Sequence, residues 1–292
     1  MQVAVTTPTG NVGREIVALL VRAGLRPRVL VRDPARLDPQ VREHVDAVAV
    51  DLTDADSVVT ATEGVEALYW VNPSAVSEDP VAEHPKLGAN AVRAITAHGI
   101  ARTVFQSSVG AEKRHGAGEI DGLARTEELL DATGAPVLHL RCGFFFTNLL
   151  ADLDAIRSGV LQVVLPLDLP MPWVAPRDVA ESSVLRLLSA AWSGHQVQAV
   201  HGPADLTWSD VAGIVSQATG HPLRVERIDD EEMRAALRSA GLPDGTVSAI
   251  LGMSIGLRDD FVAEQSRNLT STTPTTLAGW AYETLRPALQ QP

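Results

Sequence analysis

Cysteine and long apolar runs are scarce in this chain. Cys142 is the only cysteine, which excludes a disulfide framework and a zinc site built from cysteines. The eight histidines are scattered without metal-ligand spacing, so no metal site is expected. No apolar run reaches the roughly 18 residues that a membrane span needs, and the first predicted strand begins at residue 2, without the regions of a secretory signal. We therefore expect a cytoplasmic protein.

Positive charge is also in short supply. The 24 Lys and Arg residues face 36 Asp and Glu residues, which gives a net charge of −12 at pH 7. Nucleic acids and anionic membranes attract basic surfaces, so we expect neither as a partner. The 45% hydrophobic content suffices for a sizeable core, and 292 residues suggest one large domain or two closely joined ones.

Several catalytic motifs are missing as well. The chain contains no G-x-S-x-G nucleophile elbow, no H-E-x-x-H zinc motif and no lysine in a phosphate-binding loop. These absences disfavour a serine hydrolase, a metalloprotease and a P-loop nucleotidase.

Apolar strands and amphipathic helices alternate through the first half of the chain. The predicted strands are residues 2–6, 27–31, 45–50, 67–71, 102–106 and 136–140. Such alternation is typical of an α/β fold, a Rossmann-type doubly wound parallel sheet. Beyond Arg141 this alternation stops, and the segments that follow predict a smaller mixed α/β lobe. We expect a dinucleotide-binding domain over 1–148 and a substrate-binding lobe over 149–292 that partly returns to the sheet and covers the strand ends.

A glycine-containing turn joins the first strand to the first helix. Residues 7–13 read T-P-T-G-N-V-G, and a turn of this kind presents backbone N–H groups and the positive end of a helix dipole to a phosphate. Threonine stands at position 7, where the full G-x-x-G-x-x-G pattern has glycine. Because Pro8 favours an extended residue before it, we expect Thr7 to be extended and the first turn to be open, with the Thr7 and Thr9 hydroxyls facing the phosphates.

The second strand ends in Arg32. An acidic residue there would bind the 2′-hydroxyl of a ribose, whereas a guanidinium suits a 2′-phosphate. The position predicts a preference for NADP(H) over NAD(H).

Five motifs carry a resemblance to a known family. They are T-G-N-V-G at 9–13, V-L-V-R-D-P-A-R at 29–36, S-S-V-G-A at 107–111, L-R-C-G-F-F-F-T-N at 140–148 and T-P-T-T-L-A-G-W at 273–280. Together they resemble the NmrA-like branch of the atypical short-chain dehydrogenases. That branch includes NADPH-dependent quinone and triphenylmethane-dye reductases, aromatic ketoreductases and redox-sensing regulators.

The resemblance implies a role for each matching position. The pyrophosphate would be held by Thr9, Gly10, Asn11, Val12 and Gly13. The 2′-phosphate would meet Arg32 and Arg36, and the adenine would meet Asp51 and Leu52. Asn72 and Ser107 would line the path to the nicotinamide, whose ring Gly143 and Phe144 would approach.

The tyrosine and lysine by which orthodox members protonate their substrate are absent. Glu119 and Leu123 occupy the two matching positions, and the chain's only tyrosines are Tyr69 and Tyr282. We expect catalysis to depend on neither tyrosine. Ser108 is the first candidate to orient the substrate oxygen. The other candidate proton sources are His115, Glu119, Asp121, water and the substrate itself.

Three consecutive phenylalanines, residues 144–146, follow the sixth strand. They either line an aromatic pocket or pack the two lobes together, and the proline-rich segment 165–176 would act as a lid over such a pocket. We expect a monomer or homodimer that reduces a quinone or an aromatic, polyketide-like ketone. The alternative is a non-catalytic regulator that senses NADP(H).

Overall fold

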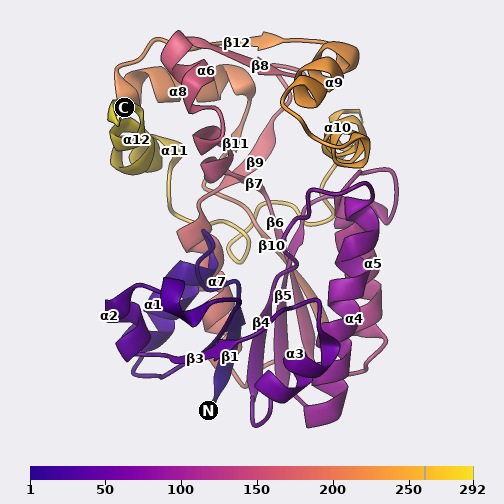
Figure 1. The fold of residues 1–292 in the computed structure, drawn as a ribbon. Helices are drawn as coiled ribbons and strands as arrows, with labels where there is room; N and C mark the ends of the chain where they lie inside the picture. Colours follow the sequence, from indigo (N-terminus) through magenta and orange to yellow (C-terminus); the bar gives the residue numbers. More distant parts are fainter. Residues whose placement is uncertain (260, 292) are drawn as a thin grey trace.

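The computed structural model describes residues 1–259 and 261–291. Its central sheet has seven strands in the order β10-β6-β5-β4-β1-β2-β3, and all neighbouring pairs are parallel (Figure 1). The strands are β1 (Val3–Thr6), β2 (Arg28–Val31), β3 (Asp46–Ala49), β4 (Ala67–Trp70), β5 (Arg102–Ser108), β6 (Val137–Cys142) and β10 (His195–Val200). This order confirms the predicted doubly wound α/β fold.

Helices cover both faces of the sheet (Figure 1). Helices α1 (Gly13–Arg22) and α7 (Pro176–Leu188) pack on one face, which we call the α1 face. Helices α3 (Ala55–Ala61), α4 (Pro80–His98) and α5 (Ile120–Asp131) pack on the other, which we call the α5 face. Because side chains alternate along a strand, each strand contributes to both cores.

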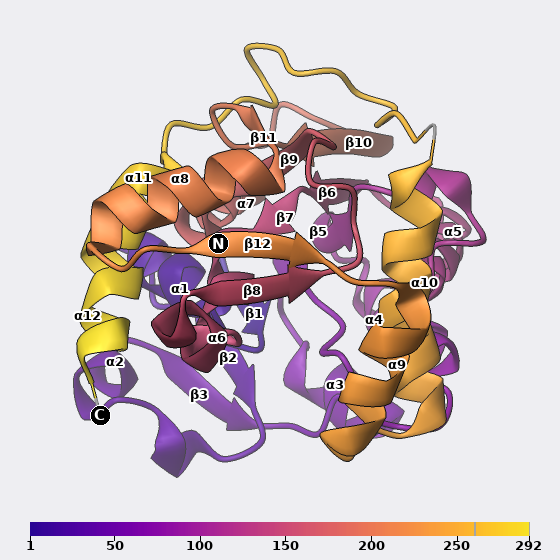
Figure 2. The ribbon, with the colours of Figure 1, turned by 90° about the horizontal axis from the view of Figure 1, so that it is seen from above.

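The second half of the chain builds a smaller lobe beyond the carboxyl ends of the strands. Two small sheets, β11-β9-β7 and β12-β8, and the helices around them form most of it (Figure 2). Its strands are β7 (Phe144–Phe145), β8 (Val160–Val163), β9 (Met171–Val174), β11 (Asp205–Leu206) and β12 (Arg224–Arg227). Its helices include α6 (Leu153–Ser158), α8 (Trp208–Thr219), α9 (Asp230–Ser239), α10 (Asp244–Arg258) and the pair α11 (Leu277–Trp280) and α12 (Arg286–Gln290). Strand β10 and helix α7 return to the main sheet.

The proline-rich segment 165–176 is not a lid. It contains β9, the middle strand of its sheet, and Trp173 and Val174 are completely buried. A segment that supplies the core of its own lobe cannot open without unfolding that lobe, so the expectation of a lid is wrong.

Within the described residues, no helix combines the length and the apolar character that crossing a bilayer requires.

A buried ion pair joins α5 to the strands β5 and β6. Glu127 is completely buried, and both of its carboxylate oxygens accept hydrogen bonds from Arg141, at 3.1 and 2.8 Å. The Ser107 hydroxyl donates to the same carboxylate at 2.7 Å, and Arg114 donates at 2.8 Å. Arg141 also contacts Glu264, in the segment that leads back from α10. The network ties together four parts of the chain that are distant in sequence.

The charge on Glu127 is essential to this network. Burial alone raises the pKa of a carboxyl group, but the hydrogen bonds from Arg141 and the charges of His139 and Arg141 outweigh it and lower the pKa of Glu127. Since the pKa in the folded state lies below the ordinary value of about 4.3, the stabilisation is present at neutral pH. It is lost as the pH falls through the lowered pKa.

We therefore predict that Glu127→Gln lowers the free energy of unfolding by about 3–5 kcal/mol at pH 7, because it leaves two guanidinium groups without their carboxylate. The variant should also lose less stability than the wild type on acidification. Glu128→Gln, on the exposed side of the same helix, is the matched control and should change stability by no more than about 0.5 kcal/mol. Urea unfolding between pH 3 and 7 measures both effects. Equal stabilities of the two variants would contradict this account.

Candidate functional site

The loop between β1 and α1 closes tightly around one carbonyl. The Thr7 carbonyl accepts a hydrogen bond from the Gly10 amide at 3.0 Å. A Cβ on Gly13 would lie 2.1 Å from the same oxygen, so only glycine lets the start of α1 approach the end of β1 this closely. Among the described residues, the amides of Asn11, Val12 and Gly13 have no acceptor. Helix α1, which starts here, has ten residues, and amides without an acceptor at the start of a helix are suited to binding an anion, so this loop is a candidate phosphate site.

Thr7 itself has a left-handed backbone, with φ of 46°. The expectation of an extended Thr7 and an open turn is therefore wrong. The carbonyl of Thr7 has to face both Gly10 and Gly13, and this geometry requires the positive φ that glycine adopts in the full motif. For a β-branched residue it costs about 1–2 kcal/mol, which the closed loop offsets.

A cleft of about 300 Å³ opens beside this loop. The predicted residues Thr7, Gly10, Asn11, Val12 and Gly13 line it together. Thr9 lies in the same loop and is exposed to solvent.

Arg32 and Arg36 lie beyond β2, which is on the side of the β1–α1 loop away from β4. Both side chains are exposed, and neither makes a hydrogen bond or an ion pair with any residue that the structure describes. Asp51 follows β3, and its carboxylate accepts hydrogen bonds from the amide and the hydroxyl of Thr53, at 2.9 and 2.8 Å. These bonds, aided by the charge of Arg32, lower the pKa of Asp51. Arg32 is therefore near the predicted adenine site and has no competing partner.

The carbonyl of Leu52, the second residue predicted to meet the adenine, accepts a hydrogen bond from Asn90 at 2.8 Å. This bond anchors the turn after β3 to α4, so the two elements hold the predicted adenine site in place.

Asn72 and Ser107 point away from the cleft, toward the α5 face. The Asn72 amide accepts from the Trp70 indole at 2.7 Å and donates to Thr126 at 3.0 Å. The Ser107 hydroxyl donates to Glu127. Both residues lie at strand ends as predicted, but their side chains already serve the packing of the helices on the sheet.

The three phenylalanines divide between the two lobes. Phe144 packs on Trp173 and Trp208, with ring centroids 4.6 and 5.9 Å apart, and Phe146 is completely buried. Phe145 is the one that lines the cleft. Gly143 packs directly on β9, since a Cβ there would lie 2.4 Å from the Pro172 carbonyl.

Seven further residues complete the wall of the cleft. Six of them were not predicted as site residues: Tyr69, Val71, Pro73, Gln106, Thr147 and Asn148. The seventh is Phe145, from the run of phenylalanines for which an aromatic pocket was one of the two expectations. Strand alternation was the available signal, because residues 69, 71 and 106 belong to the face that carries α1. Thr147 and Asn148 stand in the motif L-R-C-G-F-F-F-T-N.

The position of the orthodox tyrosine and lysine is occupied by structural contacts. Glu119 accepts a hydrogen bond from the buried His84 at 3.0 Å. Burial raises the pKa of Glu119, but hydrogen bonds from His84 and Ser74 outweigh it and lower the pKa, so this carboxylate is a poor proton donor. Asp121 accepts two backbone amides, each at 2.8 Å. The Ser108 hydroxyl donates to the Val109 carbonyl at 2.9 Å, and its predicted catalytic role stays a prediction.

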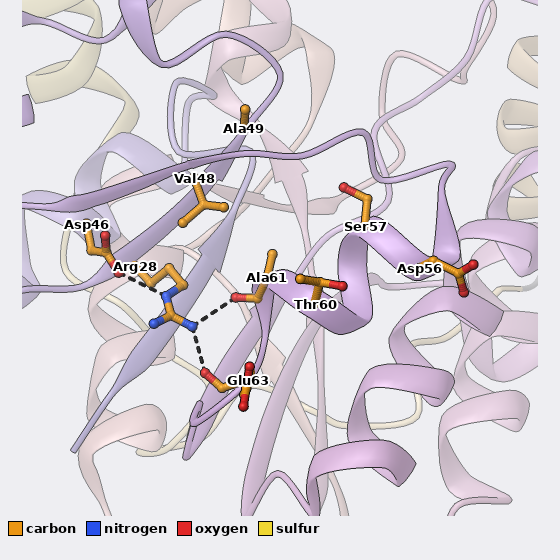
Figure 3. A pocket seen from close by; sticks show the side chains of 9 residues that line it. All are labelled: Arg28, Asp46, Val48, Ala49, Asp56, Ser57, Thr60, Ala61 and Glu63. Atoms are coloured by element: carbon orange, nitrogen blue, oxygen red, sulfur yellow. Dashed lines mark hydrogen bonds and ion pairs between the residues drawn. The ribbon is translucent and has the colours of Figure 1, made fainter.

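A larger hollow of about 660 Å³ lies at the edge strand β3, beside α3 (Figure 3). Its only arginine, Arg28, already donates to Asp46 at 3.0 Å and to the carbonyls of Ala61 and Glu63, at 3.0 and 2.7 Å. Asp56 pairs with Arg93 at 2.7 Å. Because these groups are already paired, the smaller cleft beside the loop is the better candidate site.

The parallel sheet, the glycine loop and the exposed Arg32 beyond β2 define a Rossmann-type protein. Residues 1–278 match the NmrA-like family, and the chain belongs to this family, as its motifs predicted. It is 28% identical over 258 residues to an NAD(P)H azoreductase from Xenophilus azovorans, with 87% of each chain covered. It is 30% identical over 238 residues to (4-alkanoyl-5-oxo-2,5-dihydrofuran-3-yl)methyl phosphate reductase from Streptomyces griseus, with 80% of each chain covered.

The fold also resembles that of a solved NADPH-dependent quinone oxidoreductase from Escherichia coli in complex with NADPH. The TM-score is 0.80 at 22% identity, with 97% of this chain and 99% of the other covered. These comparisons agree with the expectation of an NAD(P)H-dependent oxidoreductase.

The two loop glycines give a matched pair of variants. A Cβ on Gly13 has to displace the Thr7 carbonyl, whereas a Cβ on Gly10 would lie 3.3 Å from that oxygen and needs only a small shift. We predict that Gly13→Ala costs about 1–3 kcal/mol of stability and weakens NADPH binding at least ~10-fold, and that Gly10→Ala has a clearly smaller effect on both. Thermal unfolding and a fluorescence titration with NADPH measure the difference. The reverse order would show that the close approach to Thr7 does not shape the binding loop.

Proposed function

We propose that this protein is an NADPH-dependent reductase that transfers hydride to a quinone or an aromatic, polyketide-like ketone. The observation that supports the cofactor is the loop with three amides, together with the Arg32 side chain beyond β2, none of which has a partner among the residues that the structure describes. The amides suit the pyrophosphate, and the guanidinium suits the 2′-phosphate that distinguishes NADPH from NADH. When bound, NADPH supplies the hydride.

The rest of the cleft supports a conjugated acceptor. No tyrosine or lysine stands on α5, and Glu119, just before α5, is held ionised by its partners. A quinone delocalises the negative charge that hydride transfer creates, so it needs little proton donation from the protein in the slow step. Phe145, Val71 and Tyr69 give the cleft apolar walls suited to a flat ring. The names of two relatives also specify conjugated acceptors, an azo compound and an alkanoyl dihydrofuranone.

The cofactor preference gives the first test. Arg32→Ala should raise the Kd for NADPH about 10- to 100-fold, the value of a hydrogen-bonded charge pair, and leave the Kd for NADH nearly unchanged. Arg125→Ala removes the same charge from the exposed side of α5 and is the matched control. Calorimetric titration with both cofactors decides the matter. A wild-type protein that binds NADH as tightly as NADPH would contradict the assignment.

Turnover gives the second test. NADPH oxidation at 340 nm is followed with a panel of quinones, aromatic ketones and dyes, and we expect the highest kcat/KM with a quinone or an aromatic ketone. Tyr282→Phe, a change at an exposed tyrosine outside the cleft, should keep the wild-type rate. Tight NADPH binding without turnover of any member of the panel would contradict the reductase activity. It would favour the alternative, a non-catalytic regulator that senses NADP(H).

A further inference from the structure

Tyr69 and Gln106 form a hydrogen-bonded pair in the wall of the cleft. The Tyr69 hydroxyl donates to the side-chain oxygen of Gln106. Tyr69 lies on β4 and is completely buried, and Gln106 lies on the neighbouring β5 and is half-buried. Tyr69 is in register with Val104, so Gln106 is two residues further along β5, on the same face of the sheet. The pair is therefore a diagonal contact between adjacent strands.

The orientation of the Gln106 amide follows from the burial of Tyr69. A buried hydroxyl has to donate its one hydrogen, and the Gln106 oxygen is the acceptor that the structure provides. Burial raises the pKa of Tyr69 well above its usual value, so the hydrogen stays in place. The Gln106 oxygen thus faces Tyr69, and the amide NH₂ group has no partner among the described residues. On the other side of Gln106, its register partner on β6 is the apolar Leu140.

The sheet order indicates which part of a dinucleotide this amide meets. The order β5-β4-β1-β2 puts Gln106 and Arg32 on opposite sides of the phosphate-binding loop, which follows β1. A dinucleotide whose 2′-phosphate meets Arg32 crosses the loop and extends over β4 and β5 with its nicotinamide half. Two strand spacings, roughly 10 Å, separate β1 from β5. Gln106 and the loop residues Gly10 and Gly13 line one and the same cleft.

We propose that the Gln106 amide binds the nicotinamide half of the cofactor, as a donor to a ribose or carboxamide oxygen, and that Tyr69 is a positioning residue that acts through Gln106. This proposal rests on the proposed cofactor. It gives Tyr69 a role without proton transfer, so the loss on removal of its hydroxyl is small compared with the ~10²–10⁴-fold loss of a general acid.

The test compares NADPH with adenosine 2′,5′-bisphosphate, which has the adenine, the 2′-phosphate and no nicotinamide half. Gln106→Met keeps the volume and removes the amide. It should raise the Kd for NADPH about 3- to 10-fold, the value of one neutral hydrogen bond, and leave the Kd for the bisphosphate unchanged. Arg32→Ala should weaken both ligands. Gln106→Glu keeps an acceptor for Tyr69 and should raise the Kd for NADPH at least as much as Gln106→Met does.

The role of Tyr69 is tested by a double-mutant cycle. Tyr69→Phe should weaken NADPH binding less than Gln106→Met does, and the double variant should be no weaker than Gln106→Met alone, because Tyr69 acts only through the amide. Additive losses would overturn the role assigned to Tyr69.

Two other results would overturn the role assigned to Gln106. They are an unchanged Kd for NADPH in Gln106→Met and an equal loss of affinity for both ligands together with a lower Tm. If the Kd for NADPH is unchanged and the KM for the acceptor is raised, the amide contacts the substrate instead. The proposed reductase fails separately. If NADPH binding depends on Gln106 as predicted but the wild-type protein shows no turnover, this inference stands and the proposed reductase activity is wrong.

Discussion

The site depends on the contact between the Thr7 carbonyl and Gly13. No side chain fits between the end of β1 and the start of α1, so the helix begins directly above the strand and its first amides face the cleft. The contact also forces Thr7 into a left-handed conformation just before a proline, the position where the sequence is least suited to it. Strain of this kind persists when the surrounding structure determines it fully, and here both β1 and α1 are buried on the same core.

An orthodox short-chain dehydrogenase has its Tyr-x-x-x-Lys pair on one helix. In this chain the two faces of the sheet have separate roles, structural on one face and facing the cleft on the other. On the α5 face, Glu119 joins the start of α5 to α4, Asp121 holds the loop before α5, and Glu127 joins α5 to β6. Charges paired in this way stabilise one arrangement of the chain, but they are poorly placed to exchange protons with a substrate. The α1 face carries the loop, Gln106 and Phe145. It provides neutral donors and apolar walls, groups that are suited to binding and orientation rather than to proton transfer.

Much of this arrangement is readable in the sequence, and the part that is not has a physical cause. Apolar strands, the glycine turn and Arg32 predicted the sheet and the loop, because each depends on residues close together in the chain. Asn72 and Ser107 were placed correctly at strand ends, but the direction of a side chain depends on strand parity, and a shift of one residue moves it to the opposite face. The same parity distinguishes Phe144, on Trp173, from Phe145, in the cleft. The pairing of β8 with β12 joins residues more than 60 positions apart, and no local pattern encodes it.

Parity also separates neighbouring residues at the end of β5. Ser107 and Gln106 are adjacent in the chain, yet the Ser107 hydroxyl supports a buried ion pair and the Gln106 side chain faces the cleft. Ser108, the residue predicted to orient the substrate oxygen, has the same parity as Gln106, but its hydroxyl donates to the Val109 carbonyl. The Gln106 amide, which lines the cleft, can donate a hydrogen bond but cannot give up a proton at neutral pH. For the proposed reductase, such a site suits acceptors that stabilise a developing negative charge themselves. The substrate would then supply what the protein lacks, and this is the reason why we propose a conjugated acceptor.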